Sequence, residues 1–170
     1  MSQAETLQIT TPTDREILIT RVFDAPRRPI FEAWTNSKQV PHWMLGPEGW
    51  TMPVCEIDLR PGGAWHFIWH HQNGEKMEMH GEYREIKPPE RLVSTECWGG
   101  DWPETLNTLV LTEENDKTTA ALTILYPSKK ARDAGLECGM KDGMVPTFSR
   151  LDALLRSMQS SAAAGQTSGS

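Results

Sequence analysis

The stretch "VCEIDLRPGGAWHFIWHH", residues 54–71, contains two runs in which apolar and polar side chains alternate. A Pro-Gly-Gly turn separates the runs, and we interpret Arg60 as bracing that turn through the carboxylate of Asp58. Alternation with a period of two is the pattern of a β-strand that buries one face. The stretch therefore predicts two antiparallel strands joined by a tight connection.

Similar short runs continue from about residue 52 to residue 126, and turn residues such as Asn73-Gly74 and Asn115-Asp116 separate them. They predict six strands, and "EILITRVF" at residues 16–23 predicts one more before them. Because the connections are short, neighbouring strands should run antiparallel. The expected core of the fold is a curved, seven-stranded antiparallel sheet.

Helical spacing appears on both sides of the strand region. Two short helices are predicted after residue 24, the second carrying Val40 and Trp43. Near the C-terminus one apolar stripe with spacings of three and four predicts a long helix, formed by Met140, Met144, Phe148, Leu151, Leu155 and Met158. Pro146 predicts a break or kink between residues 138 and 146. The predicted fold class is α+β, with the long C-terminal helix lying across the sheet.

The chain of 170 residues is expected to form one domain, over residues 15–158. Residues 1–14 are expected to be a flexible N-terminus and residues 159–170 a disordered tail, because neither end offers an apolar face to bury. The middle of the chain shows no internal repeat and no linker.

Composition excludes several classes of partner. The net charge is −6, with Lys and Arg scattered along the chain, which argues against binding to nucleic acid. No apolar run approaches the roughly 20 residues that span a bilayer, so no membrane insertion is expected. The N-terminus lacks the pattern of a signal peptide, and the three cysteines are isolated. These features predict a cytoplasmic protein.

Four blocks of the sequence resemble the SRPBCC superfamily, the helix-grip fold shared with START domains and the birch-pollen allergen. Within it the chain is similar to the branch related to the C-terminal domain of the activator of heat shock protein 90 ATPase. The blocks are "ITRVFDAPRRPIFEAWTN", "VCEIDLRPGGAWHF", "HGEYREIKPPERLVST" and "GMKDGMVPTFSRLDALL". One departure is Met144, where the branch usually has Trp; Pro146 so near the start of the helix is another.

The resemblance implies a capacity to hold hydrophobic small molecules in a cavity between the sheet and the last helix. It implies no single reaction, because the superfamily includes lipid carriers, cyclases and resistance proteins.

The alternation in residues 64–71 places Trp65, Phe67 and Trp69 on one strand face, which we expect to point inward. Two interpretations remain open for these rings: they are ordinary core, or they form the wall of a ligand pocket. The size of Trp and its N–H group favour the pocket, as do Gly135, Gly139 and Gly143, which would leave space on one helix face. The predicted ligand-binding residues are Trp65, Phe67, Trp69, Met77, Met79, Trp98, Met140, Met144 and Phe148.

No metal, cofactor or catalytic residue is predicted. His66 and His70 lie four residues apart on one strand face, which is too far to chelate one ion. No nucleophile elbow, phosphate loop or metalloprotease motif is present. Glu56, Asp58 and Glu96 could serve as acid or base, but carboxylates on strands are expected to be solvated.

Three functions from different classes follow. The first is a non-catalytic carrier or sequestering protein, monomeric or homodimeric, that binds an apolar or aromatic small molecule. The second is an enzyme of cyclase or hydrolase type that acts in the same cavity. The third is a chaperone accessory; we expect it to be wrong, because the family's co-chaperone carries an additional N-terminal domain that this chain lacks.

Overall fold

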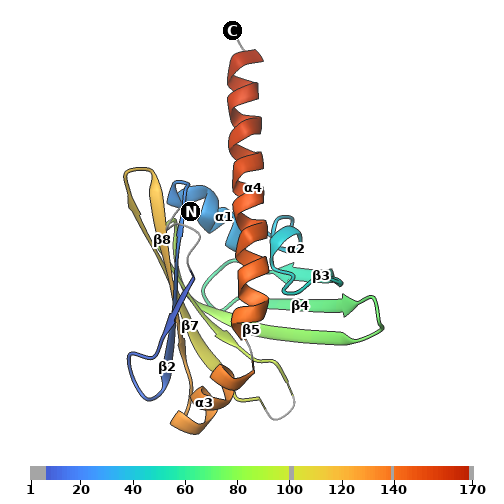
Figure 1. The fold of residues 1–170 in the computed structure, drawn as a ribbon, viewed down its shortest axis with the longest axis vertical. Helices are drawn as coiled ribbons and strands as arrows, with labels where there is room; N and C mark the ends of the chain where they lie inside the picture. The colour runs from blue at the N-terminus through green and yellow to red at the C-terminus, as the bar shows by residue number, and fades with distance from the viewer. Residues whose placement is uncertain (1–6, 100–101, 139, 169–170) are drawn as a thin grey trace.

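The computed structural model describes residues 7–99, 102–138 and 140–168, with side chains described as far as residue 158. Its centre is one open antiparallel sheet in the order β1-β2-β8-β7-β6-β5-β4-β3, so that β1 and β3 form the two edges (Figure 1). The strands are β1 (Gln8–Thr10), β2 (Glu16–Phe23), β3 (Trp50–Ile57), β4 (Ala64–His71), β5 (Lys76–Lys87), β6 (Arg91–Glu96), β7 (Thr105–Glu114) and β8 (Lys117–Leu125).

The sheet has eight strands rather than the predicted seven. The additional strand is β1, which pairs antiparallel with β2 and lies inside the segment that we expected to be flexible. A strand of three residues is too short to show alternation above its surroundings, which is why the pattern missed it. The seven predicted strands and their antiparallel pairing are confirmed.

Four helices accompany the sheet: α1 (Arg27–Thr35), α2 (Val40–Trp43), α3 (Lys129–Glu137) and α4 (Met140–Ser168). A break falls within the expected window of residues 138–146, because α3 ends at Glu137 and α4 begins at Met140, and Pro146 itself stands inside α4. Helix α4 also continues through most of the predicted disordered tail. No helix of the described chain is both long and apolar enough to span a membrane.

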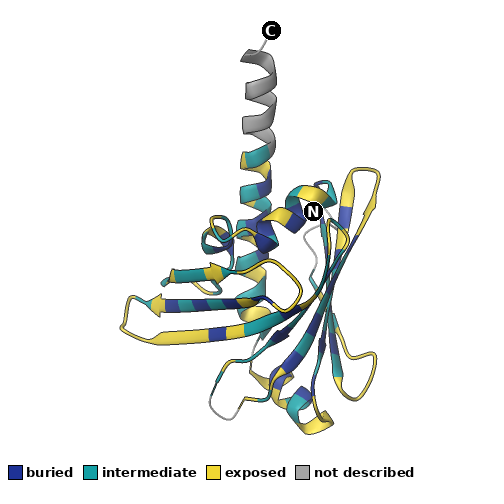
Figure 2. Cartoon of the chain, turned by 180° about the vertical axis from the view of Figure 1, so that it is seen from behind, coloured by how far each residue is buried: buried dark blue, intermediate teal, exposed yellow. Residues whose placement is uncertain are grey.

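Helix α4 crosses the inner face of the sheet and projects beyond it (Figure 1). Most of the most deeply buried side chains come from β2, α1, α2 and α4, and Figure 2 shows buried residues on the helices and along the strands of the sheet. Phe148 of α4 packs its ring against Phe23, Trp34 and Trp43, with ring centroids 5.7–6.5 Å apart. Helix α4 is therefore seated mainly on an aromatic cluster that β2 and the two short helices supply.

Polar contacts tie α4 to the rest of the fold at two places. The guanidinium of Arg21 on β2 donates to both carboxylate oxygens of Asp152, with Nη1 2.9 Å from Oδ1. Near the start of the helix, Thr147 accepts from the Gly46 N–H at 2.8 Å, and Arg150 donates to the Gly46 carbonyl at 2.6 Å. The helix is thus held both to the sheet and to the loop before β3.

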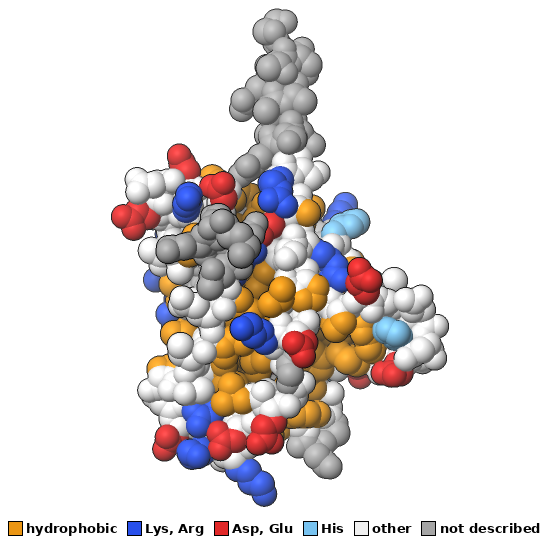
Figure 3. All heavy atoms as spheres, in the orientation of Figure 1, with side chains coloured by type: hydrophobic (Ala, Val, Ile, Leu, Met, Phe, Trp, Pro, Cys, Tyr) orange, Lys and Arg blue, Asp and Glu red, His pale blue; other side chains and the backbone are white. Residues whose placement is uncertain are grey.

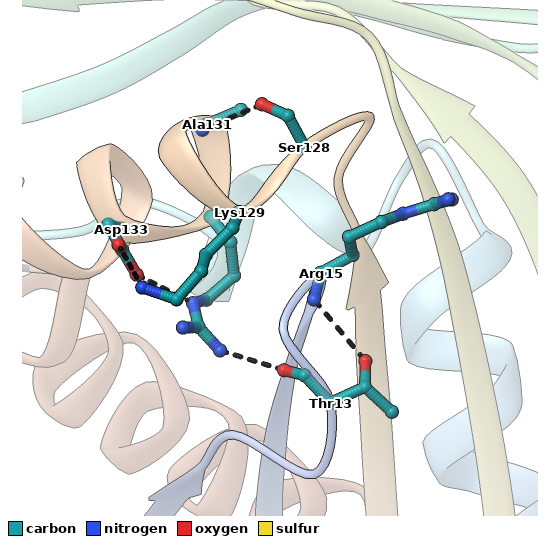
Figure 4. A network of polar contacts seen from close by, with 7 residues as sticks. Thr13, Arg15, Ser128, Lys129, Ala131 and Asp133 are labelled. Carbon is teal, nitrogen blue, oxygen red and sulfur yellow. Dashed lines mark hydrogen bonds and ion pairs between the residues drawn. The ribbon is translucent and has the colours of Figure 1, made fainter.

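Helix α3 lies at the end of the sheet and is fixed to the β1–β2 turn (Figure 4). Its N-terminus is capped by Ser128, whose hydroxyl accepts from the N–H of Ala131 at 3.1 Å. Arg132 donates to the carbonyl of Thr13 at 2.7 Å. The absence of a side chain at Gly135 leaves room for the Tyr126 hydroxyl, which would lie 2.3 Å from an added Cβ.

The predicted turns have the backbone that their residues favour. Asn115 and Asp116 both have positive φ, at 55° and 63°, as a two-residue type I′ hairpin requires. Gly74 in the β4–β5 hairpin has φ 98°. Arg60 Nε lies 2.9 Å from Asp58 Oδ2, which confirms the predicted brace of the Pro-Gly-Gly turn.

Candidate functional site

The aromatic row of β4 faces the interior. Trp65, Phe67 and Trp69 are each 5% exposed, and their ring centroids follow one another at 4.9 Å and 5.9 Å. The inward orientation predicted from the alternation is therefore confirmed. Trp69 is held in place by its Nε1, which donates to the Met44 carbonyl at 2.8 Å.

Trp98, just after β6, continues this row toward solvent. Its ring stacks on Trp69 with a centroid distance of 5.7 Å and an interplanar angle of 13°. It is nevertheless 39% exposed. The row of stacked rings therefore continues from the buried interior to the protein surface. A flat apolar ligand could stack on its exposed end.

Trp65 has a buried polar atom without a partner. Its Nε1 is enclosed by protein, yet it donates to no acceptor among the described residues. The ring lies over Gly81 of β5, where an added Cβ would stand 2.7 Å from two of its carbons. Because a buried N–H normally finds an acceptor, this donor marks a position where a ligand atom would be favourable.

A carboxylate lies on the same inner face, at the end of β6. Glu96 Oε1 accepts from Trp98 Nε1 at 2.6 Å, and its Oε2 accepts from Asn107 Nδ2 at 2.6 Å. Asn107 is oriented in turn by Thr105, whose hydroxyl donates to the Asn107 carbonyl oxygen at 2.9 Å. The chain Thr105–Asn107–Glu96–Trp98 joins β7 and β6 to the aromatic row.

Burial raises the pKa of Glu96, and the hydrogen bonds from Trp98 and Asn107 oppose that rise. Glu96 is therefore a partly buried, hydrogen-bonded carboxylate rather than a fully solvated one. Burial also raises the pKa of Tyr126 to about 12, with a further contribution from the charge of Glu96. A carboxyl group with a raised pKa beside an apolar surface is a recurring feature of functional sites.

The predicted methionines and Phe148 do not lie in one common environment. Met79 is buried on β5 directly opposite Phe67, whereas Met77, opposite Trp69, is 38% exposed. Met140 and Met144 lie partly buried at the start of α4. Phe148 belongs to the cluster with Phe23, Trp34 and Trp43 instead of the β4 row. Of the three glycines that were expected to leave space on one helix face, Gly139 lies outside the described residues.

Hydrophobic side chains are visible beside the N-terminal part of α4, over β4 and β5 and toward α3 (Figure 3). Grooves are also present on the described part of the chain. One of about 260 Å³ separates α4 from β2 and is lined by Leu7, Arg21, Val145, Phe148, Ser149, Asp152 and Arg156. Another, of about 470 Å³, lies at the ends of β6, β7 and β8 and is bordered by Thr105 and Tyr126.

Sequence reasoning missed the Glu96–Asn107–Thr105 chain, although one signal was present. In "TLNTLVL" the alternation places Thr105 and Asn107 on the same strand face as the buried Leu109 and Leu111. A polar residue at an inward position must find a partner on the same sheet face. That requirement points to Glu96, which pairs with Thr105 in the β6–β7 register.

His66 and His70 lie on the outer face of β4, opposite to its aromatic row. His66 Nε2 lies 3.0 Å from Glu78 Oε2, and its Nδ1 lies 3.7 Å from Glu56 Oε1. The hydrogen bond from His66 lowers the pKa of Glu78. Among the residues described, no three His, Cys, Asp or Glu side chains converge as a metal ion would require.

An open antiparallel sheet that packs against a long C-terminal helix defines a helix-grip protein of the SRPBCC superfamily. Within it, residues 24–156 match the model of the activator of Hsp90 ATPase homolog 1-like protein family, and the chain belongs to that family. Among curated proteins, no sequence matches the chain.

Solved structures of bacterial proteins share the fold. A protein from Rhodobacter sphaeroides is 27% identical with a TM-score of 0.83, covering 89% of this chain and 99% of its own. Protein Ms6760 from Mycobacterium smegmatis is 24% identical with a TM-score of 0.78, covering 88% and 97%. An AHSA1-like protein from Aeromonas hydrophila is 15% identical with a TM-score of 0.66, covering 81% and 93%.

Proposed function

We propose that the protein binds an apolar or aromatic small molecule against the inner face of β4–β6, beside the start of α4. The observation that carries the proposal is the aromatic surface that runs from the buried β4 rings to the exposed ring of Trp98. Core packing alone does not explain why a large ring stacks on the core and stays open to water on its other face, because that face buries no apolar surface.

Two further features support a ligand at this place. The N–H of Trp65 has no acceptor within the described part of the chain, and the Glu96 carboxyl lies on the same face. A small number of placed polar groups within an apolar surface is typical of ligand sites, since the apolar part supplies affinity and the polar groups fix orientation. The methionines at the border, Met77, Met140 and Met144, offer flexible side chains that adapt to ligand shape.

The test is a fluorescence titration with N-phenyl-1-naphthylamine, a neutral apolar fluorophore. We expect saturable binding to the wild type and a weakening of about tenfold in Trp98→Ala, because an aromatic stacking partner contributes roughly 0.5–1.5 kcal/mol beyond area. Trp102→Ala is the matched control, because Trp102 is exposed in the same loop. An equal loss in both variants would assign the binding to the loop and contradict the proposal.

Acid–base catalysis on an apolar substrate is a second candidate function, and the raised pKa of Glu96 is the observation that favours it. Hydrolysis of 1-naphthyl acetate provides a measurement. Turnover above the buffer rate that disappears in Glu96→Gln, while binding of the fluorophore is retained, would support the enzyme.

The name of the family refers to activation of the Hsp90 ATPase. The ligand-binding proposal expects the ATPase rate of purified Hsp90 to be unchanged when this protein is added. A stimulation of several-fold would instead place the chain among chaperone accessories.

A further inference from the structure

The carboxylate of Glu96 is held entirely by neutral donors. One oxygen accepts from the indole N–H of Trp98 and the other from the amide of Asn107, both at 2.6 Å. The hydroxyl of Thr105 donates to the Asn107 carbonyl oxygen, and this bond fixes the amide with its NH₂ group toward Glu96. The surroundings of Glu96 are therefore built to receive a carboxylate at one fixed position.

No cationic side chain pairs with this carboxylate among the residues that the structure describes. Within the described part of the chain, Glu96 forms no ion pair with Lys, Arg or His. The side chains outside that part are those of residues 1–6, 100–101, 139 and 159–170, and the sequence has no Lys, Arg or His there. Glu96 is partly buried, and a partly buried carboxylate without a positive partner carries an uncompensated desolvation cost, so a cation arriving from outside would be bound favourably.

The groups around Glu96 also suit a cation. The rings of Trp98 and Trp69 stack at 5.7 Å, and Trp98 remains accessible to solvent. The face of an indole ring is the best aromatic partner for an ammonium group, through the negative potential above the ring. A carboxylate beside exposed aromatic rings is the combination with which proteins hold organic cations, because the charge and the alkyl or aryl body are both accommodated.

We propose that the ligand is an apolar amine, bound in its protonated form, whose ammonium group pairs with Glu96 and lies against the ring of Trp98. This inference rests on the proposed function and names the chemical class of the ligand for that site. The apolar body of the amine would lie along the aromatic row of β4.

A matched pair of probes separates charge from shape. 1-Naphthylmethylamine and 1-naphthylmethanol have nearly the same size and apolar surface, and the amine keeps its proton between about pH 5 and pH 8. Isothermal titration of both probes against the full chain at neutral pH should show the amine binding at least tenfold more tightly. The affinity of the amine should fall as the pH decreases and Glu96 takes up a proton, while the affinity of the alcohol should stay level.

Two isosteric variants locate the effect. Glu96→Gln should abolish the preference for the amine and leave the affinity for the alcohol within about threefold. Glu78→Gln removes the same charge from the outer face of β5 and should keep the preference. This control is needed because a protein with net charge −6 attracts cations weakly at any surface.

The outcomes distinguish the inference from the proposed function. If the alcohol binds as tightly as the amine to the wild type, or if Glu96→Gln retains the preference, the amine inference is wrong while ligand binding stands. If neither probe nor the neutral fluorophore binds, the proposed function fails and the inference fails with it.

Discussion

The ion pair between Arg21 and Asp152 links α4 to the sheet, and Asp152→Ala breaks it. The Arg21 side chain is 5% exposed and that of Asp152 17%, so both charges are largely removed from water. After the substitution Arg21 keeps a 3.3 Å hydrogen bond to the Val22 carbonyl and its position 4.5 Å from the centroid of the Phe23 ring. The variant therefore leaves a buried guanidinium with only part of its partners.

The expected cost follows from that geometry. Removing one partner of a buried ion pair destabilises proteins by about 3–5 kcal/mol, because a buried charge is left without compensation. For Asp152→Ala we expect a loss at the lower end of this range, about 3 kcal/mol, because Arg21 keeps part of its contacts and Asp152 is partly exposed. The double variant Arg21→Met/Asp152→Leu buries no charge and should lose less than about 1 kcal/mol.

Urea unfolding followed by circular dichroism measures these free energies. An exposed pair within the same chain is the control: the side chains of Arg60 and Asp58 are 74% and 49% exposed, and Arg60→Ala should cost less than about 1 kcal/mol. If Asp152→Ala costs no more than Arg60→Ala, or the double variant is as unstable as the single one, the pair does not hold α4 as argued.

Four further predictions concern packing, charge and the N-terminus. Gly81→Ala should lower the free energy of unfolding in urea by about 3 kcal/mol, since its Cβ would lie 1.9 Å from a backbone oxygen. Gly143→Ala is the contrasting case: the nearest atom is 3.7 Å away, so the added methyl group should raise the free energy of unfolding by about 0.5–1 kcal/mol. Because the folded-state pKa of Glu96 is raised, its contribution to stability is lost as the pH rises from about 4 through that pKa. Glu96→Gln should flatten this part of the melting-temperature profile, and an unchanged slope would contradict the assignment. Trp69→Ala should cost about 3–5 kcal/mol in the same unfolding assay, because the ring is buried and hydrogen-bonded; a loss below about 1 kcal/mol would show that the ring is not core. Deleting residues 1–10 removes β1 and should lower the melting temperature by several degrees, and an unchanged value would show that this strand is dispensable.

The strands and the inward face of β4 were predictable, because alternation is a local property that folding does not change. Trp65, Phe67 and Trp69 share a face by their spacing alone, and the hairpin at Asn115-Asp116 follows from residues that tolerate positive φ. The Ser128 cap is local in the same sense.

The candidate site was only half predictable, because it depends on the register between strands. Alternation shows that Asn107 points inward, but only the β6–β7 pairing places Glu96 within reach of its amide. Likewise, nothing near Phe148 in the sequence indicates that its ring meets Phe23 and Trp43, which are brought to α4 by the tertiary fold.

The strand order also affects how the protein folds during synthesis. Strands β3 to β8 are each hydrogen-bonded to the next one along the chain, whereas β2 pairs with β8, so that Glu16 lies opposite Leu125. The apolar side chains of β2, which leave the ribosome early, must therefore wait with only the three-residue strand β1 as a sheet neighbour until residues 117–125 have been made. Over that interval the loop to be closed spans most of the domain, so the last pairing is the slow one. Nascent chains that end before β8 should consequently expose β2 and be the ones that chaperones and proteases engage.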